Sequence, residues 1–579
     1  MKSLDKIYKF KWSGCTLLIC ILILSLKSPV RITQDAEEPK YSGTMIIQNR
    51  AEPPHFNLGI SMAYGMEPAC NIYESLVSWD YNVNPHPELA ESWEISPDYK
   101  TFTFHLRHDI TWHDGEPFTS ADVKFTIEEV LIPHNPMGKL AFLFFESIVT
   151  PDDYTVVFQF KMSRVFFMVF LNPVSAPMLP KHLYENTDIM KNPYNEKPVG
   201  TGPFRLAEWV KGDHVTLVRN ENYYDKRKPY LDKLIFKTMP KAETALAALE
   251  NKEIDVLTAA ATGMLLHEVP RLEAAGFKTS WHGWEYWKGT PNLVFNTIRP
   301  ITGDIKVRQS IAHALDTEQI TKLVGQGYYV VSRGTFPSTM PYYKPDVKQY
   351  PYDPEKANEL LNEAGYPKDS ATGVRFKLNL ISDATIPSLV KASEIVKAQL
   401  KEVGIDVEML PLEVGTLIAR ETAGNFDLIM ELGTMGPDPS TYWAYHYHSR
   451  FIRVPFGNMA FYTNSRVDLL LDMATVNVDT AKLKEYYYEI QDIVAEELPS
   501  LLFYETRDPW VFSPDFGGVI PPGPNGGYQS YKNAYWIKGQ EQIAPSPVWV
   551  WEVIVAIVVV VAVAAAVAVI VRRRRTQAQ

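Results

Sequence analysis

The stretch Pro87–Val123, PELAESWEISPDYKTFTFHLRHDITWHDGEPFTSADV, decides which fold class we expect for this chain. Within it, Thr101–Arg107 alternates between apolar and polar residues, and three apolar side chains share one face: Phe102, Phe104 and Leu106. Such alternation predicts a strand with one buried side. Further on, Thr119-Ser-Ala-Asp122 predicts the capped start of a helix over 121–130. The stretch therefore indicates mixed α/β structure.

Working outward, the remaining patterns divide the chain into a first part of strands and loops and a second part that is more regularly α/β. We expect further strands at 154–161, 215–219, 234–238, 405–410 and 426–432. We expect helices at 243–249, 307–324, 353–365, 388–403 and 481–498. No repeat of 20–50 residues is visible in the sequence, which argues against solenoids and propellers.

The two ends of the 579-residue chain have a different composition from the middle. Lysines precede the apolar run Gly14–Leu26, a pattern typical of a secretory signal sequence or an uncleaved signal-anchor. Near the other end, Val553–Val571 has 19 residues without a charge, and Arg572–Arg575 follow it directly. This pattern predicts a transmembrane helix with a cytoplasmic basic tail, which leaves the body outside the cytoplasm.

Charge is distributed unevenly along the chain. Each end, 1–40 and 552–579, carries +3, so an overall charge of −11 leaves −17 on residues 41–551. Such an acidic body argues against nucleic-acid binding, which depends on neutralising phosphates. The body contains a single cysteine, Cys70, so it has no intrachain disulfide and must be stabilised by a large core.

Motifs that carry chemistry are missing from the sequence. It has no G-x-S-x-G, no phosphate-binding loop, no dinucleotide fingerprint, no H-E-x-x-H and no acidic calcium loop. We therefore predict no catalytic residues, no cofactor and no metal site. His446 and His448 remain a weak alternative as a metal pair.

Two aromatic clusters stand out instead. The first contains Trp281, Trp284, Tyr286 and Trp287, and the second contains Tyr442, Trp443, Tyr445 and Tyr447. Large rigid aromatic side chains suit a cleft that binds varied small ligands. Packing in a core or at a rim is the alternative interpretation for each of them.

Several ordered blocks resemble extracellular solute-binding protein family 5, the peptide/nickel class that serves ABC importers. The strongest is Pro87–Val123, and Ile72–Trp79 (IYESLVSW) lies just upstream. A second block is Pro198–Asn222 (PVGTGPFRLAEWVKGDHVTLVRNEN), and a third joins Phe295-Asn-Thr297 to Val307–Asp316 (VRQSIAHALD). The resemblance runs from about residue 44 to about residue 540.

The resemblance implies an α/β, two-lobed clamshell of the periplasmic-binding-protein type II, with an extra subdomain in the first lobe. The uncharged run 553–571 adds the expected C-terminal transmembrane helix. We expect the following division: 1–40 leader and linker, 41–287 first lobe, 288–502 second lobe, 503–538 return to the first lobe, 539–552 stalk, 553–571 transmembrane helix and 572–579 tail. The two chain crossings would form the hinge.

The resemblance also indicates ligand-binding residues. In peptide-binding relatives an Asp in a G-W-x-x-D-x-x-D-P-like loop pairs with the peptide ammonium, and here Gly433–Pro439 places Asp438 at the Asp-Pro end. The usual Trp is absent and the loop is shorter, which keeps oligosaccharides open as ligands. The expected ligand-binding residues are Asp438, Tyr442, Trp443, Trp284 and Trp287.

The function implied is that of a membrane-tethered, extracytoplasmic binding protein of an ABC importer. It would not be an enzyme, would capture oligopeptides and would deliver them to permease and ATPase partners. The same role for oligosaccharides or another solute is the first alternative. A tail-anchored surface hydrolase and a receptor that has lost its importer are further alternatives.

Overall fold

The computed structural model describes residues 39, 41–60, 66–80, 84–258, 266–281, 288–435, 439–519 and 530–537. The helices and strands in these ranges belong to one compact unit that begins at Lys40. The predicted leader and the predicted transmembrane helix 553–571 fall outside these ranges. Among the helices within them, none combines the length and the apolar character needed to cross a bilayer.

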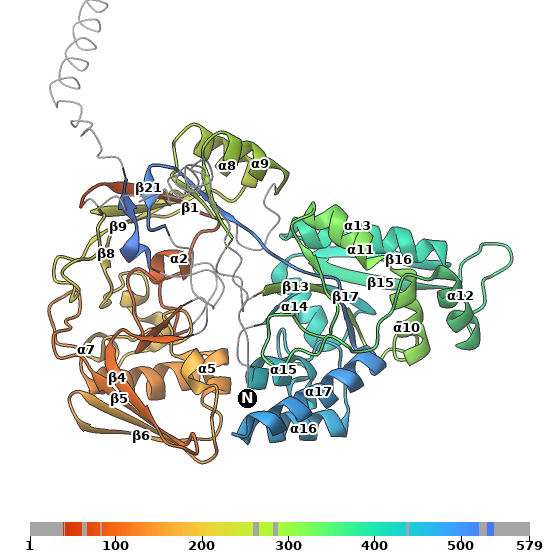
Figure 1. Ribbon diagram of the computed structural model, residues 1–579, viewed down its shortest axis with the longest axis horizontal. Helices are drawn as coiled ribbons and strands as arrows, with labels where there is room; N and C mark the ends of the chain where they lie inside the picture. Colours follow the sequence, from red (N-terminus) through yellow and green to blue (C-terminus); the bar gives the residue numbers. More distant parts are fainter. Residues whose placement is uncertain are drawn as a thin grey trace, which may run out of the picture. The chain divides into compact units, whose positions relative to one another are not determined.

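The first lobe is built on a seven-stranded sheet, and the strands of this sheet come from distant parts of the chain (Figure 1). In order across the sheet they are β12 (Lys278–Ser280), β20 (Trp510–Phe512), β11 (Val256–Leu257), β1 (Thr44–Asn49), β10 (Lys233–Thr238), β9 (His214–Arg219) and β8 (Phe204–Val210). The central strands β11, β1 and β10 are parallel, and the other neighbours are antiparallel. Met45 and Ile47 are completely buried in the core of this sheet. The predicted strands at 215–219 and 234–238 are therefore confirmed.

The stretch Pro87–Val123 contributes to a four-stranded antiparallel sheet that forms an additional part of the first lobe. Its order is β4 (Ala90–Ile95), β5 (Thr101–Leu106), β7 (Thr155–Phe160) and β6 (Phe145–Asp152). The alternation in β5 holds, because Phe102, Phe104 and Leu106 are buried in a separate core. A helical segment follows, made of α3 (Ser120–Phe125), a π-helical turn Thr126–Leu131 and α4 (Ile132–His134). Thr119 and Asp122 form its capping box, as the sequence predicts.

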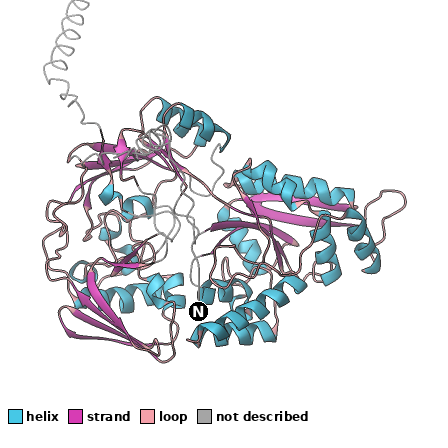
Figure 2. Cartoon of the chain, viewed as in Figure 1, coloured by secondary structure: helices cyan, strands magenta, loops and turns pink. Residues whose placement is uncertain are grey.

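The second lobe is built on a five-stranded sheet with helices on both faces (Figure 2). The strand order is β16 (Ile405–Leu412), β15 (Phe376–Asp383), β17 (Leu428–Met435), β13 (Lys288–Phe295) and β18 (Ser500–Leu502). One core takes side chains from α10 (Ile305–Ala314), α11 (Thr317–Gly325), α12 (Pro354–Glu363) and α13 (Pro387–Glu402). The other takes them from α14 (Val414–Ala423), α15 (Pro439–Tyr447), α16 (Ser465–Val476) and α17 (Thr480–Glu497).

One predicted helix is wrong in its extent. The spacing of apolar residues over 307–324 predicts a continuous helix, but the structure has α10 and α11, separated at Leu315 and Asp316. Leu315 adopts an extended backbone, and the Asp316 side chain accepts a hydrogen bond from the Gln319 N–H at 2.9 Å. Asp316 thus caps a new helix, which the apolar periodicity alone does not reveal.

Short elements complete the described chain. They are α2 (Met66–Ala69), α5 (Pro136–Ala141), α6 (Phe167–Phe170), α7 (Lys181–Tyr184), α8 (Ala242–Glu250) and α9 (Val269–Ala274), with the strand pairs β2 (Val77–Trp79) and β3 (Pro85–Pro87), β14 (Val330–Val331) and β19 (Tyr504–Glu505), and β21 (Phe516–Gly517) and β22 (Tyr535–Trp536). Strand β19 pairs with β14, so Tyr504 and Glu505 lie against Val330 and Val331.

Lys532, in the described segment 530–537, pairs with two buried carboxyl groups from the N-terminal part of the chain. Lys532 Nζ lies 2.8 Å from Glu88 Oε1 and 3.9 Å from Glu74 Oε1. The Tyr223 hydroxyl donates a 2.6 Å hydrogen bond to the same oxygen of Glu74. Burial, followed by the charge of Glu88, raises the pKa of Glu74 to about 8. The two contacts of Lys532 connect residues more than 400 positions apart in the sequence.

Candidate ligand-binding site

The parallel strands of the second lobe end at a common edge of their sheet. Strands β15, β16 and β17 run parallel and finish at Asp383, Leu412 and Met435. Strand β13 runs the other way and begins at this same edge, because Lys288 pairs with Met435. In open α/β sheets, ligands bind outside the carboxyl ends of the strands. This carboxyl edge is therefore the first half of the candidate site.

The first lobe has an equivalent edge. Strands β1, β10 and β11 are parallel, and Arg50 and Thr258 follow the ends of β1 and β11. Glu67, on α2, is almost fully buried, and its Oε2 has no hydrogen-bond partner among the residues that the structure describes. Burial raises the pKa of Glu67 to about 7, while Arg50 and a hydrogen bond from Thr258 oppose that rise. A carboxyl group, a guanidinium group and a hydroxyl group therefore lie together at this second half of the site.

A crossing segment, 506–509, joins the two edges. The Thr506 N–H donates a 2.9 Å hydrogen bond to the carbonyl of Gly289, near the start of β13. Four residues later, Trp510 begins β20 beside the end of β11. A link of this length spans at most about 14 Å, so the two edges are close to each other.

Side chains of the crossing segment are anchored on the second lobe. Asp508 is completely buried, and its Oδ1 accepts a 2.7 Å hydrogen bond from the Tyr329 hydroxyl. The Arg507 guanidinium lies 5.7 Å from the centre of the Trp281 ring, which in turn stacks on Tyr328 at 5.0 Å. Only a few residues of the crossing segment make these contacts. Short segments of this kind act as hinges in two-lobed proteins.

Close backbone packing shapes the carboxyl edge of the second lobe. A Cβ at Gly289 would lie 2.8 Å from Thr506 Oγ1, and a Cβ at Gly433 would lie 2.9 Å from Asn292 Nδ2. Thr290 Oγ1 donates a 2.9 Å hydrogen bond to the carbonyl of Gly433. Glycine at these two positions thus allows β13, β17 and the crossing segment to pack together.

One carboxyl group on β17 has no partner among the residues that the structure describes. Glu431 is partly buried, and no described residue forms a hydrogen bond or ion pair with its side chain. Burial raises the pKa of Glu431 to about 8, and the negative charges of Glu421 and Asp383 add to that rise. Asp383 itself is satisfied, because the Thr385 N–H and hydroxyl each donate to its Oδ1 at 2.7 Å. A cation near Glu431 would therefore be favourable, since it would allow the carboxylate to ionise.

The predicted site residues are only partly within the described chain. Asp438, Trp284 and Trp287 lie outside the described residues, so their role stays a prediction. Tyr442 and Trp443 lie on α15, the helix that follows the end of β17. Tyr442 is partly buried and packs against the core beneath that helix.

Trp443 is a core residue. It is completely buried, and its ring stacks on Phe336 with 3.4 Å between ring centres and 3° between the planes. Tyr487 contacts it edge-on at 4.7 Å. A covered indole offers no surface to a ligand, so the packing interpretation fits Trp443 better than the predicted ligand contact.

The weak metal alternative has no support from the described histidines. Ring nitrogens of His448 lie 3.2 Å from Asp468 and 3.3 Å from Asp472, so this ring connects the end of α15 to α16. Within the described ranges, no group of three or more potential metal ligands lies together. No sequence motif singled out Arg50, Glu67, Thr258 or Glu431. A signal existed for Glu431, which is an acid inside the otherwise apolar run 428–432 (LIMEL).

The two carboxyl edges and the crossing between them define a two-lobed solute-binding protein. A sequence model of bacterial extracellular solute-binding proteins, family 5 (middle region), matches residues 84–452, more than half of the chain. The chain belongs to this family. Its members are transport binding proteins, so the protein is not an enzyme.

Relatives and solved structures agree with this assignment. The chain is 28% identical to the dipeptide-binding protein of Escherichia coli K12 over 461 residues, covering 74% of this chain and 82% of that protein. It is also 28% identical to heme-binding protein A of Haemophilus influenzae, covering 74% and 80%. Helicobacter pylori DppA, solved with the peptide STSA, is 26% identical, with a TM-score of 0.72 over 86% of this chain and 99% of that one. Bacillus subtilis AppA, solved with a nonapeptide, has the same fold, with a TM-score of 0.74 at 23% identity over 86% of this chain and 100% of that one.

Proposed function

We propose that this protein captures oligopeptides between its two lobes and delivers them to the permease of an ABC importer. The observation that carries the proposal is the carboxyl group of Glu431 in the middle of β17, level with the end of β15, which has no partner among the described residues and lies upstream of Asp438 in the same strand and loop. An acidic group in a desolvated cleft is suited to a peptide ammonium. The peptide-binding names of the relatives support the same ligand class.

Heme or another solute is the second candidate ligand. The relative named as a heme-binding protein is as similar to this chain as the dipeptide-binding protein is. Equal identity to proteins with such different ligands means that overall similarity does not choose between them. Oligosaccharides, which the shortened 433–439 loop keeps open, form a third class.

Thermal-shift measurements decide between these classes, because a ligand that binds the folded state raises its melting temperature. The full chain would be screened in detergent against tri- to pentapeptides, heme and oligosaccharides. We expect peptides to raise the melting temperature, and N-acetylated versions of the same peptides to have a much smaller effect. Stabilisation by heme or sugars alone would overturn the peptide assignment.

Asp438→Ala tests the residue that the family resemblance indicates. We expect the change to weaken peptide binding at least tenfold, because the ligand ammonium would lose a charged partner in the cleft. Isothermal titration calorimetry with a tripeptide measures the effect. Asp346→Ala, outside the proposed cleft, is the control, and unchanged affinity in Asp438→Ala would remove Asp438 from the site.

We also propose the lobe division 41–287 and 288–502, with hinges at the two crossings and return of the chain to the first lobe over 503–538. The distribution of strands between the seven-stranded and five-stranded sheets supports this division. A membrane tether through 553–571, with the binding module outside the cytoplasm, belongs to the same proposal and rests on the apolar sequence alone.

A further inference from the structure

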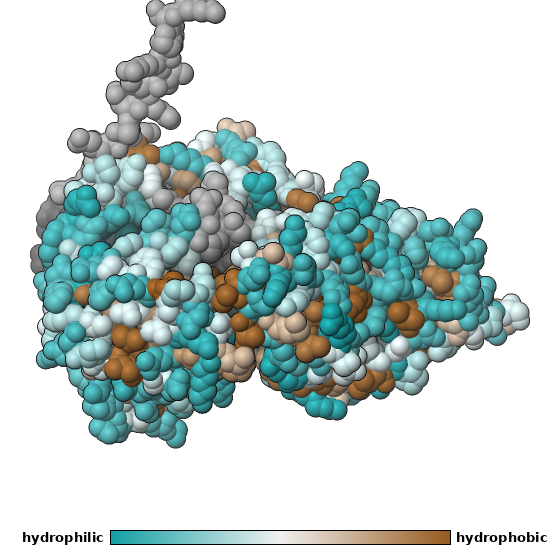
Figure 3. All heavy atoms as spheres, turned by 60° about the horizontal axis from the view of Figure 1, so that its bottom comes forward, coloured by the Kyte–Doolittle hydropathy of each residue, from teal (hydrophilic) through white to brown (hydrophobic). Residues whose placement is uncertain are grey.

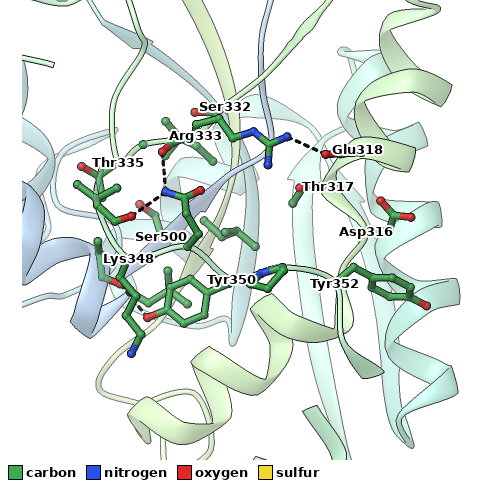
Figure 4. Close-up of a pocket in the computed structure, with 18 residues that line it drawn as sticks. Asp316, Thr317, Glu318, Ser332, Arg333, Thr335, Lys348, Tyr350, Tyr352 and Ser500 are labelled. Carbon is green, nitrogen blue, oxygen red and sulfur yellow. Dashed lines mark hydrogen bonds and ion pairs between the residues drawn. The ribbon is translucent and has the colours of Figure 1, made fainter. Parts of the chain in front are cut away.

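Outside the candidate ligand-binding site, the second lobe contains a pocket of about 360 Å³ (Figure 4). Its basic side chains already have partners within the chain. Arg333 Nη2 donates to Glu318 Oε1 at 2.7 Å, and Lys348 Nζ lies 2.9 Å from Glu496 Oε1. A charged ligand would have to displace these partners. The first lobe carries a surface of a different kind, on which basic side chains outnumber acidic ones.

Three tyrosines lie in contact at the amino edge of the seven-stranded sheet. Tyr41 lies three residues before β1, Tyr230 lies three residues before β10, and their ring centres are 5.1 Å apart. Tyr535, on β22, contacts Tyr230 edge-on at 5.9 Å. Tyr41 is 52% exposed, and the other two are partly buried. We call these three residues, together with the adjoining basic residues 226–228, the amino-edge patch.

The basic part of this patch has few acidic partners. Lys226, Arg227 and Lys228 are consecutive, and the carbonyl of Arg227 accepts a 2.9 Å hydrogen bond from the Tyr41 hydroxyl. One carboxylate, that of Asp225, lies 3.4 Å from Arg227 Nε and 4.0 Å from Lys228 Nζ. Lys226 is exposed, and no described residue forms an ion pair with it. Residues 219–233 carry +2 within a body of −17, so this edge attracts anions.

Both apolar runs of the sequence are joined to the chain beside this patch. The link 27–40 connects the run 14–26 to Tyr41, and the link 538–552 connects the segment of Tyr535 to the run 553–571. The links have 14 and 15 residues, so neither spans more than about 50 Å. With either run in a bilayer, the patch stays within that distance of the lipid surface. A link this short gives a high effective concentration, so even a weak contact with lipid is populated.

We propose that the amino-edge patch docks on the headgroups of anionic phospholipids, an inference that rests on the tether proposed above. Phosphate oxygens accept hydrogen bonds from lysine and arginine, and tyrosine rings favour the interface between headgroups and acyl chains. The attraction between a basic segment and an anionic bilayer falls off within a Debye length, so salt screens it. The contact therefore orients a module that the apolar run anchors.

This contact also sets the direction of the ligand site. The patch lies where β1 and β10 begin, whereas Arg50 and Thr258 lie at the carboxyl edge of the same sheet. Strand β1 has six residues, which separates the two edges by about 20 Å. While the patch rests on lipid, the carboxyl edge faces the solution from which a ligand is captured. Delivery to a permease in the same membrane then requires the module to leave the lipid.

Lysine acetylation of the full chain in lipid nanodiscs tests the proposal, because a lysine that is covered reacts more slowly. The discs contain either phosphatidylglycerol or phosphatidylcholine, and mass spectrometry gives the rate at each lysine. We expect Lys226 to react about threefold more slowly in phosphatidylglycerol, and we expect high salt to remove the difference. Lys482 is the control, because it is exposed on α17 of the second lobe, and it should react equally in both lipids.

Matched variants assign the protection to the patch. Arg227→Gln and Tyr41→Ser change exposed side chains, and we expect each to reduce the difference between the two lipids at Lys226. Arg333→Gln and Tyr352→Ser, at exposed positions of the second lobe, are the controls and should leave that difference unchanged. Near-UV circular dichroism checks folding, and Arg227→Gln decides if Tyr41→Ser does not fold. Protection that survives both patch variants would contradict the proposal.

The outcomes separate this inference from the proposed function. A chain that enters discs of neither lipid would overturn the tether and the inference together. A chain that enters both, with equal acetylation of Lys226, would leave the tether standing and overturn the inference alone. Arg227→Gln and Tyr41→Ser should leave the peptide-induced thermal shift in detergent unchanged. The absence of any peptide shift in the wild-type chain would refute the peptide assignment, while the nanodisc comparison would still decide the lipid contact.

Discussion

At the scale of single residues, buried charge is concentrated where distant segments meet. Lys532 lies between Glu88 and Glu74, and both carboxyl groups are almost completely covered. Burial alone would lower the pKa of Lys532, but Glu88, Tyr224 and Glu74 raise it above its ordinary value. The lysine is therefore held as a cation and compensates the buried carboxyl groups.

Lys532→Met tests this role. We expect the variant to lose about 3–5 kcal/mol of its free energy of unfolding, because buried carboxyl groups would lose their partner. Urea unfolding, followed by circular dichroism, measures the loss. Lys191→Met, at an exposed pair with Asp188, is the control and should change stability by less than about 1 kcal/mol. Equal effects of the two variants would contradict the role given to Lys532.

Glu431 predicts a dependence of stability on pH. Its pKa is raised to about 8 in the folded chain, from an ordinary value of 4.5. Between these two values the folded state holds a proton that the unfolded state has released, so stability falls as pH rises from about 5 to about 8. Glu67, Glu74 and Glu421 have pKa values raised in the same direction and add to the trend.

Glu431→Gln removes the contribution of this one group. We expect the variant to gain stability relative to wild type as pH rises from 5 to 8, since the amide does not ionise. Unfolding in urea at pH 5, 6, 7 and 8 measures the difference. Glu94→Gln, at an exposed position on β4, should show no such trend. A stability difference that is constant with pH would show that Glu431 ionises normally.

At the scale of elements, β17 serves two cores at once. Leu428 and Met430 point into one core, and Ile429 points into the other. Both faces of the strand are therefore apolar at 428–430. Glu431 is the one charged residue in the run 428–432 (LIMEL). Runs of this kind are typical of strands covered on both faces.

The contact between β13 and the crossing segment depends on Gly289. Gly289→Val would place atoms within 2.8 Å of the Thr506 side chain, and we expect a loss of about 1–3 kcal/mol of stability together with weaker peptide binding. Thermal unfolding and titration calorimetry measure the two effects. Gly415→Ala is the control, because the nearest atom to its added Cβ is 3.6 Å away. That control should be neutral or slightly stabilising in helix α14. Unchanged unfolding of Gly289→Val would show that β13 and the crossing segment can move apart without loss of stability.

At the scale of the whole molecule, the body carries −17 between two ends of +3 each. On the face seen in Figure 3, hydrophilic residues predominate and the hydrophobic residues lie in small groups. Scattered apolar residues are normal for the surface of a water-exposed module. The charged body and the uncharged run 553–571 therefore differ sharply in composition, which is the basis of the proposed tether.

Deletion of residues 548–579 tests the proposed tether. We expect the truncated chain to appear in the soluble fraction after cell fractionation, because the apolar run 553–571 is removed. Deletion of 572–579 alone is the control and should leave the chain in the membrane fraction. Retention of the longer truncation in the membrane would assign anchoring to the apolar run at 14–26.

The sequence by itself determined the local elements and the family. The alternation in β5, the capping box of Thr119 and Asp122, and the Asp353 cap of α12 all lie within a few residues, where propensity and hydrogen bonding act directly. It could not reveal the Lys532–Glu74 cluster, the burial of Trp443 or the unpaired state of Glu431. Most of these features depend on contacts between segments from tens to hundreds of residues apart, because burial and partner choice arise only when the chain is packed. The tertiary structure alone decided which aromatic side chain belongs to a core, and which carboxyl group on the central strand β17 has no partner among the described residues.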